Sequence, residues 1–232
     1  MRTPLTLTAS ALAMAFAAAP ALSAPNTNPN IDADKVDIRT WDTAPLASGW
    51  SADELIGAEV RGPGGEDIGE VENLVLGSDN MIRKLVFSTG GFWDIGDKHL
   101  AVAWNQVTVG PQGEYVTVPV TEETVDQYGM FDDAPERASV KQRDWRATEL
   151  IGDYVRLEND VNYGYVQDMV FDDAGKLQAV VVEPDVGYGT MRGPYAYPFY
   201  GYGYGWTPGN DYYDMPYASD EVRDLDRFEW NT

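Results

Sequence analysis

Carboxylates are the reactive side chains that this sequence offers in number, with 38 Asp and Glu among 232 residues. Pairs occur at Asp32 and Asp34, Glu122 and Glu123, Asp132 and Asp133, and Asp172 and Asp173. Two carboxylates facing each other across a cleft, about 5 to 9.5 Å apart, can hydrolyse a glycosidic bond. A hydrolase of the cell envelope that uses only carboxylates is therefore one alternative function.

Calcium binding needs more than paired carboxylates, because the ion takes six to eight oxygen ligands from a loop of defined spacing. The best candidate, Asp172-Asp173-Ala174-Gly175, has no glutamate at the required distance and is typical of a hairpin turn instead. We therefore predict no metal site. A weak, diffuse attraction for divalent cations is still expected from the charge, so an acidic cation-binding stress protein is a second alternative.

Nucleophilic catalysis has little support in the sequence. Cysteine is absent and His99 is the single histidine, which excludes thiolate chemistry and a histidine-rich metal site. No nucleophile-elbow motif accompanies His99, so a Ser-His-Asp triad has no anchor. We predict a chain without catalytic residues or cofactors.

Aromatic side chains gather between Gly187 and Tyr217, where nine of the 14 tyrosines lie. Tyrosine gives a large contact area with few rotatable bonds and a polar tip, which suits recognition. The candidate partner-binding residues are Tyr195, Tyr197, Tyr200, Tyr202, Tyr204 and Trp206. The other interpretation is a low-complexity segment whose rings pack on the chain's own fold.

The formal net charge of -22 limits the possible partners. Such a surface repels nucleic-acid phosphates and anionic lipid. Residues 1–24 have the pattern of a secretory signal, with Arg2 before an apolar stretch, Ala11 to Ala19, that is too short to span a bilayer. We expect a periplasmic protein without stable membrane insertion after cleavage, whose partners are envelope proteins and not nucleic acid.

The elements that must position these side chains form one unit that occurs twice. Glu54-Leu55-Ile56-Gly57 returns 95 residues later as Glu149-Leu150-Ile151-Gly152. Further segments match at the same offset: Val60-Arg61 with Val155-Arg156, Leu74-Val75-Leu76 with Met169-Val170-Phe171, and Leu85-Val86-Phe87 with Val180-Val181-Val182. An internal duplication explains this register.

Each copy has the pattern of short strands and Gly-rich turns. Strands are predicted at 58–61, 67–76, 81–88, 100–103 and 115–118, and in the second copy at 154–157, 163–171 and 176–183. Gly69 and Gly164 lie inside strands, where glycine marks a bulge or bend. Ser51 is expected to cap a helical turn with Glu54. Because several strands are apolar on both faces, we expect the copies to pack together.

The motifs resemble the PRC-barrel family. The first copy matches through its Gly90-Gly91-Phe92 turn, the Gly96-Asp97-Lys98 step and Val102-Ala103-Trp104, where Ala103 replaces the usual proline. The second copy is more distant: we assign 187–213 to a Tyr/Gly-rich insertion and take Met215-Pro216-Tyr217 as the counterpart of Val102-Ala103-Trp104. The resemblance implies a six-stranded β-barrel that binds other proteins, with no shared catalytic residue.

The resulting prediction is an all-β protein of two small PRC-barrel-like barrels with short helical turns. Its expected organisation is a signal peptide at 1–24, a polar segment at 25–50, a first barrel at 51–133, a linker at 134–145 and a second barrel at 146–228. We expect a non-enzymatic, exported binding or scaffolding protein of the cell envelope.

Overall fold

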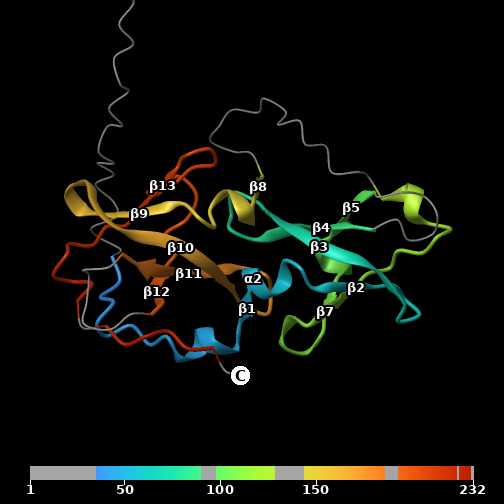
Figure 1. Cartoon of the computed structure of the whole chain (residues 1–232), viewed down its shortest axis with the longest axis horizontal. Coiled ribbons are helices and arrows are strands. Elements are labelled where there is room, and N and C mark those ends of the chain that lie inside the picture. The colour runs from blue at the N-terminus through green and yellow to red at the C-terminus, as the bar shows by residue number, and fades with distance from the viewer. Residues whose placement is uncertain (1–34, 90–97, 129–143, 186–192, 224, 231–232) are drawn as a thin grey trace, which may run out of the picture.

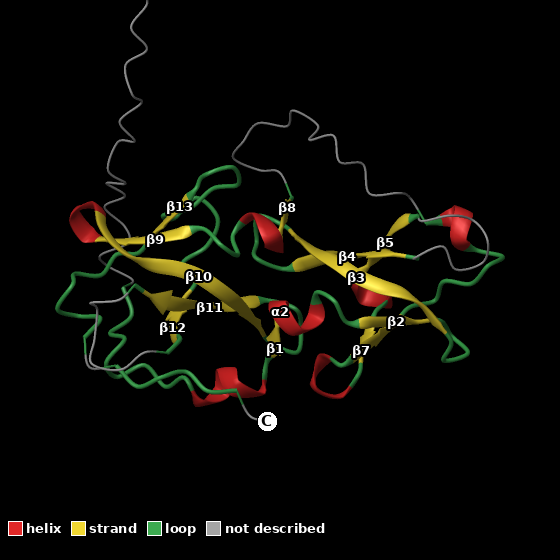
Figure 2. Cartoon of the chain, viewed as in Figure 1, coloured by secondary structure: helices red, strands yellow, loops and turns green. Residues whose placement is uncertain are grey.

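The two copies form two β-sheets of the same design (Figures 1 and 2). The structure is a computed structural model that describes residues 35–89, 98–128, 144–185, 193–223 and 225–230. The strands are β1 Trp50–Ser51, β2 Glu59–Arg61, β3 Asp67–Leu76, β4 Ile82–Ser88, β5 His99–Ala103, β6 Thr108–Val109, β7 Tyr115–Thr117, β8 Trp145–Arg146, β9 Tyr154–Leu157, β10 Val161–Phe171, β11 Leu177–Pro184, β12 Tyr195–Pro198 and β13 Tyr212–Asp214. This confirms the all-β class.

The helical elements are short. One α-helical turn, α2 (Ala52–Leu55), begins after Ser51, whose hydroxyl accepts a hydrogen bond from the Glu54 N–H at 3.1 Å. The remaining turns are 3-10 helices at Ala44–Ser48, Trp104–Gln106, Pro111–Gly113, Val125–Gln127, Ala147–Glu149 and Glu158–Asp160. None of the described helices has the length and apolarity needed to cross a membrane.

Strand order is equivalent in the two sheets. The first copy runs β5-β4-β3-β2-β7-β6 and the second runs β12-β11-β10-β9-β13. In both, neighbouring strands pair antiparallel except for one parallel pair, β2 with β7 and β9 with β13. Each predicted strand is present, with ends within two residues of those expected.

A glycine lies in the long strand of each copy at a point where a neighbouring backbone passes close to it. The register is shifted next to Gly69 and next to Gly164. A Cβ added to Gly69 would lie 1.9 Å from the Ser88 carbonyl oxygen, and one at Gly164 would lie 2.1 Å from that of Glu183. Both predicted bulges are confirmed, and the close approach of the backbones explains why each position is glycine.

The first strand of each copy pairs with the sheet of the other copy. β1 pairs with β10, and β8 pairs with β3. The register pairs are Trp50 with Phe171, Ser51 with Val170, Leu76 with Trp145, and Val75 with Arg146. Each residue has its counterpart 95 positions away in the other copy, so the exchange is reciprocal.

The turns between the long strands continue this junction. Met81 and Lys176, which are counterparts, form an antiparallel bridge. The Ile82 N–H donates to the Gly175 carbonyl and the Leu177 N–H donates to the Asn80 carbonyl, both at 2.9 Å. Apolar residues of both sheets then form one continuous core. The predicted packing of the copies is therefore confirmed.

One buried carboxylate lies at the junction. Asp168, 6% exposed, accepts hydrogen bonds from the Ser51 hydroxyl at 2.5 Å and from the N–H groups of Asp53 at 3.0 Å and Met169 at 2.7 Å. Burial raises the pKa of Asp168 to about 6, against the lowering effect of these donors. The counterpart in the first copy is Asn73, whose amide donates to the Thr148 hydroxyl at 2.7 Å.

The outer face of the second sheet is covered by the ends of the described chain. Trp41, Leu46 and Ala47 pack there with Phe228 and Trp230, over a cluster formed by Val170, Ala179, Val181 and Ala196. We call residues 35–49 the N-terminal arm. The segment 25–50, predicted to be polar from its composition, therefore also contributes apolar residues that pack on the second sheet.

The predicted insertion at 187–213 is corrected by the strand register. The described part, 193–213, supplies β12 and β13, which occupy the places of β5 and β7. Val180 pairs with Tyr197 as Leu85 pairs with Val102. The counterpart of Val102-Ala103-Trp104 is thus Tyr197-Pro198-Phe199, and not Met215-Pro216-Tyr217. The reason is that substitution of most β5 residues hid a segment whose length is unchanged up to β12, where the offset between the copies is still 95 residues. The segment is two residues longer before β13, where the offset from Tyr115 to Tyr212 is 97.

Two of the predicted domain limits differ by one residue from those that the strands indicate. Trp50 and Trp145 were assigned to the polar segment and the linker, but each begins the exchanged strand of its copy. Both residues contact the other copy's sheet, and a two-residue strand has no pattern of its own. The rest of the predicted linker, apart from Asp144, lies outside the described residues, as do residues 1–24.

We predict that Gly69→Ala and Gly164→Ala each lower the free energy of unfolding by about 3 kcal/mol or more, because the added methyl group meets a backbone carbonyl that cannot move without breaking the sheet. Urea denaturation measures the change. Gly64→Ala is the matched control: its Cβ would lie 2.6 Å from Glu66 Oε2, the end of a flexible side chain. Equal effects at all three positions would contradict the proposed close approach.

We predict that Asp168→Asn stabilises the fold increasingly as the pH rises from 4 to 7. Folding raises the pKa of Asp168 from 3.8 to about 6, so the folded chain holds this proton more tightly and stability from this group falls across that interval. Asparagine at this position does not titrate, so the unfolding free energy of the variant lacks this decrease. The unfolding free energy of the variant minus that of wild type should therefore increase by about 3 kcal/mol between pH 4 and 7. Asp126→Asn, which alters an exposed ion pair with Lys98, is the charge control. Parallel pH curves for wild type and Asp168→Asn would contradict the prediction.

Candidate functional site

Three of the six predicted partner-binding residues lie in the interior. Tyr195, Tyr197 and Trp206 are 6%, 0% and 1% exposed. The Tyr197 hydroxyl is hydrogen bonded to that of Tyr163 at 2.6 Å, and the Trp206 ring packs on Trp145 with centroids 4.8 Å apart. A partner cannot reach these side chains in this conformation, because they fill the core of the second copy.

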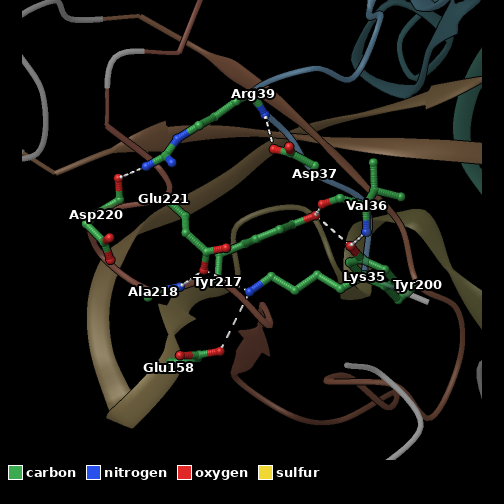
Figure 3. A network of polar contacts seen from close by, with 10 residues as sticks. All are labelled: Lys35, Val36, Asp37, Arg39, Glu158, Tyr200, Tyr217, Ala218, Asp220 and Glu221. Atoms are coloured by element: carbon green, nitrogen blue, oxygen red, sulfur yellow. Dashed lines mark hydrogen bonds and ion pairs between the residues drawn. The ribbon is translucent and has the colours of Figure 1, made fainter. Parts of the chain in front are cut away.

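Tyr200 has a different role, since it holds the N-terminal arm (Figure 3). Its hydroxyl accepts a hydrogen bond from the Val36 N–H at 3.1 Å and is hydrogen bonded to the Tyr217 hydroxyl at 2.5 Å. Tyr217 in turn donates to the Val36 carbonyl at 3.2 Å, and Lys35 pairs with Glu221 at 2.8 Å. These contacts fix the start of the arm on the second copy.

The last two predicted residues lie nearer the surface. Tyr202 is half-buried against the core, and its N–H donates to the Asn80 side chain at 3.3 Å. Tyr204 is 41% exposed. Of the six predicted residues, Tyr204 is thus the one with a substantially exposed ring.

A surface that the sequence analysis missed lies across β13, β9 and β10. Tyr212, Tyr154 and Tyr165 are 38%, 61% and 41% exposed. Tyr154 pairs in register with Tyr212 on one side and with Tyr165 on the other, so the three side chains share one face. The ring centroids of Tyr154 and Tyr212 are 6.0 Å apart. We call these three residues the tyrosine row.

The first copy has a different row at the same place. Its register residues are Tyr115 on β7, Glu59 on β2 and Glu70 on β3. Tyr154 and Tyr165 therefore replace two glutamates at identical positions of the sheet. Alignment of the two copies at their offset of 95 residues shows both replacements, and this was the signal that could have found the surface.

An arginine stacks on the tyrosine of the last strand in both copies. The Arg61 guanidinium carbon lies 3.9 Å from the Tyr115 ring centroid, and that of Arg156 lies 4.3 Å from the Tyr212 centroid. Glu59 accepts the Arg61 Nε–H at 2.7 Å, whereas Asp214 accepts from Arg156 Nε and Nη2 at 2.6 and 2.9 Å. These bonds lower the pKa of Glu59 and raise the pKa of both arginines.

A half-buried carboxylate, Asp153, precedes Tyr154 in the chain. Asp153 accepts a hydrogen bond from Trp206 Nε1 at 2.6 Å. Burial, and then the charges of Asp211 and Glu149, raise the pKa of Asp153 to about 6. Asp153 and Asp168 are thus each engaged by fold-forming donors, and nothing in their surroundings favours a catalytic pair.

Asp172, the first residue of the pair at 172 and 173, and the single histidine, His99, have structural contacts, whereas Glu122 and Glu123 are exposed. Asp172 accepts the N–H groups of Ala174 and Lys176 and the Gln178 amide, as expected of a hairpin turn. His99 Nδ1 lies 2.6 Å from Glu72 Oε2. In the described part of the chain, no three histidine or acidic side chains cluster as metal ligands do. The pairs at 32 and 34 and at 132 and 133 lie outside it.

Comparison with known proteins agrees with the duplicated architecture. The PRC-barrel domain model matches residues 50–125 and 144–207, which is more than half of the chain. A search of the curated proteins gave no match. The two matched segments begin at the exchanged strands and together contain the strands of both sheets except β13. The chain therefore belongs to the PRC-barrel family and carries two copies of its domain in tandem.

Proposed function

We propose that this chain is a non-enzymatic binding or scaffolding protein, exported to the periplasm, that contacts envelope proteins through the tyrosine row. The signal-like pattern of residues 1–24 supports export. The membership of a family whose domain serves protein–protein interaction supports a binding role. The observation that carries the proposal is the replacement of Glu59 and Glu70 of the first copy by exposed Tyr154 and Tyr165 in the second.

An exposed aromatic ring by itself is common, but three in one row are not explained by folding. Apolar patches on a soluble surface often mark interaction sites. The first copy has the same sheet with glutamates at two of the three positions, so the rings are not needed to build it. The tyrosines therefore fit a contact surface that only the second copy provides.

We predict that Tyr154→Glu/Tyr165→Glu abolishes the capture of envelope proteins from a native extract while leaving the fold intact. The glutamates place the first copy's own residues on the equivalent strands, so the sheet should tolerate them. Affinity capture followed by mass spectrometry compares the variant with wild type, and thermal unfolding checks the fold.

Tyr204→Ser is the control for this experiment, because Tyr204 is as exposed as Tyr165 but lies off the row. The control should recover the same partners as wild type. If the double variant also recovers them, the tyrosine row is not the contact surface.

A further inference from the structure

The ring of Tyr212, on the last strand of the sheet, already binds a cation from within the chain. The guanidinium of Arg156 lies over Tyr212, at a distance typical of cation–π contacts, and Asp214 binds the same guanidinium through two hydrogen bonds. The first copy repeats the arrangement with Arg61, Tyr115 and Glu59. An arginine stacked on tyrosine and paired with a carboxylate is therefore a contact that this surface of the domain makes twice.

The other two rings of the row have no such occupant. Within the described residues, no arginine or lysine stacks on Tyr154 or Tyr165. Both rings are more exposed than that of Tyr212, at 61% and 41% against 38%. Two aromatic faces suited to a cation thus point to solvent beside one that is filled from within the chain.

One carboxylate lies beside these rings. Glu183 lies directly opposite Tyr165 on β11, and therefore on the same face. The nearby cation, Arg156, is itself paired with Asp214 and lies 3.5 Å from Asp160. With a net charge of -22 on the whole chain, the row attracts cations and repels anionic ligands.

We propose that the tyrosine row binds a basic segment of a partner protein, whose arginines stack on Tyr154 and Tyr165 while one of them pairs with Glu183. This inference rests on the proposed binding function and names the chemistry of the partner. Side chains of an extended peptide that share a face are about 6.6 Å apart. Tyr154 and Tyr165 are directly paired on adjacent antiparallel strands, where Cβ atoms lie about 4.5 to 5.5 Å apart, so two long arginine side chains from one face of the peptide can reach both rings. The recognised pattern is therefore arginine at alternate positions.

The test uses the full chain and a short synthetic peptide of alternating arginine and serine, with affinity measured by fluorescence anisotropy. We expect Tyr154→Ser/Tyr165→Ser to weaken binding about tenfold, because two stacked cations are lost. Tyr154→Phe/Tyr165→Phe keeps both rings and should bind within about twofold of wild type. Tyr204→Ser is the matched control and should leave the affinity unchanged.

The peptide chemistry separates stacking from general charge attraction. An alternating glutamate–serine peptide should not bind, and a lysine–serine peptide should bind more weakly than the arginine peptide, because the planar guanidinium stacks on aromatic faces. Equal affinity of the arginine peptide for wild type and for Tyr154→Ser/Tyr165→Ser would overturn the inference, since only diffuse charge would then act.

The two proposals fail in different ways. Suppose that Tyr154→Glu/Tyr165→Glu no longer captures envelope proteins, while the affinity for the arginine peptide is the same in wild type and in Tyr154→Ser/Tyr165→Ser. The binding function then stands, and the proposal of a basic partner segment is wrong. If neither partner capture nor peptide binding depends on the row, both proposals fall.

Discussion

The reciprocal exchange of first strands is the constraint on which this structure depends. β1 completes the sheet of the second copy and β8 that of the first, so each copy would leave backbone groups of β3 or β10 unpaired without the other. The bridge at Met81 and Lys176 and the continuous core extend the same junction. The two domains therefore form one folding unit, and the parts of the outward sheet faces that the ends of the described chain do not cover are left for other contacts.

Local patterns predicted most of the fold because the strands are defined by short-range signals. The limits of β3 and β9 matched the expected residues, and the turns between strands followed from glycine, aspartate and asparagine. The junction could not be predicted in the same way. Its strands have two residues each, and the pairing of Trp50 with Phe171 or Trp145 with Leu76 is decided by the topology of the whole chain. The sequence indicated that the copies pack together, but not through which strands.

The candidate site was predicted less well, for a physical reason. The Tyr/Gly-rich segment drew attention by its composition, yet alternation along β12 turns Tyr195 and Tyr197 toward the core of the second copy. Apart from Tyr204, the large exposed rings are those of Tyr154, Tyr165 and Tyr212, which lie on three strands and meet only through their register. Composition finds aromatic residues but not their burial, whereas a comparison of equivalent positions in the two copies identifies the difference that matters.

A change in the source of one carboxylate explains how the second copy can expose its tyrosines. In the first copy, Arg61 takes its ion-pair partner from the row itself, because Glu59 occupies the position of Tyr154. In the second copy, Asp214 on β13 supplies that carboxylate, so Arg156 stays paired when the row position becomes aromatic. Moving the negative charge to β13 keeps the internal arginine–tyrosine stack and opens the neighbouring strand to an external cation. The same interaction, an arginine stacked on a tyrosine beside a carboxylate, is thus made inside both copies, and after the duplication the second copy can also offer it to a partner.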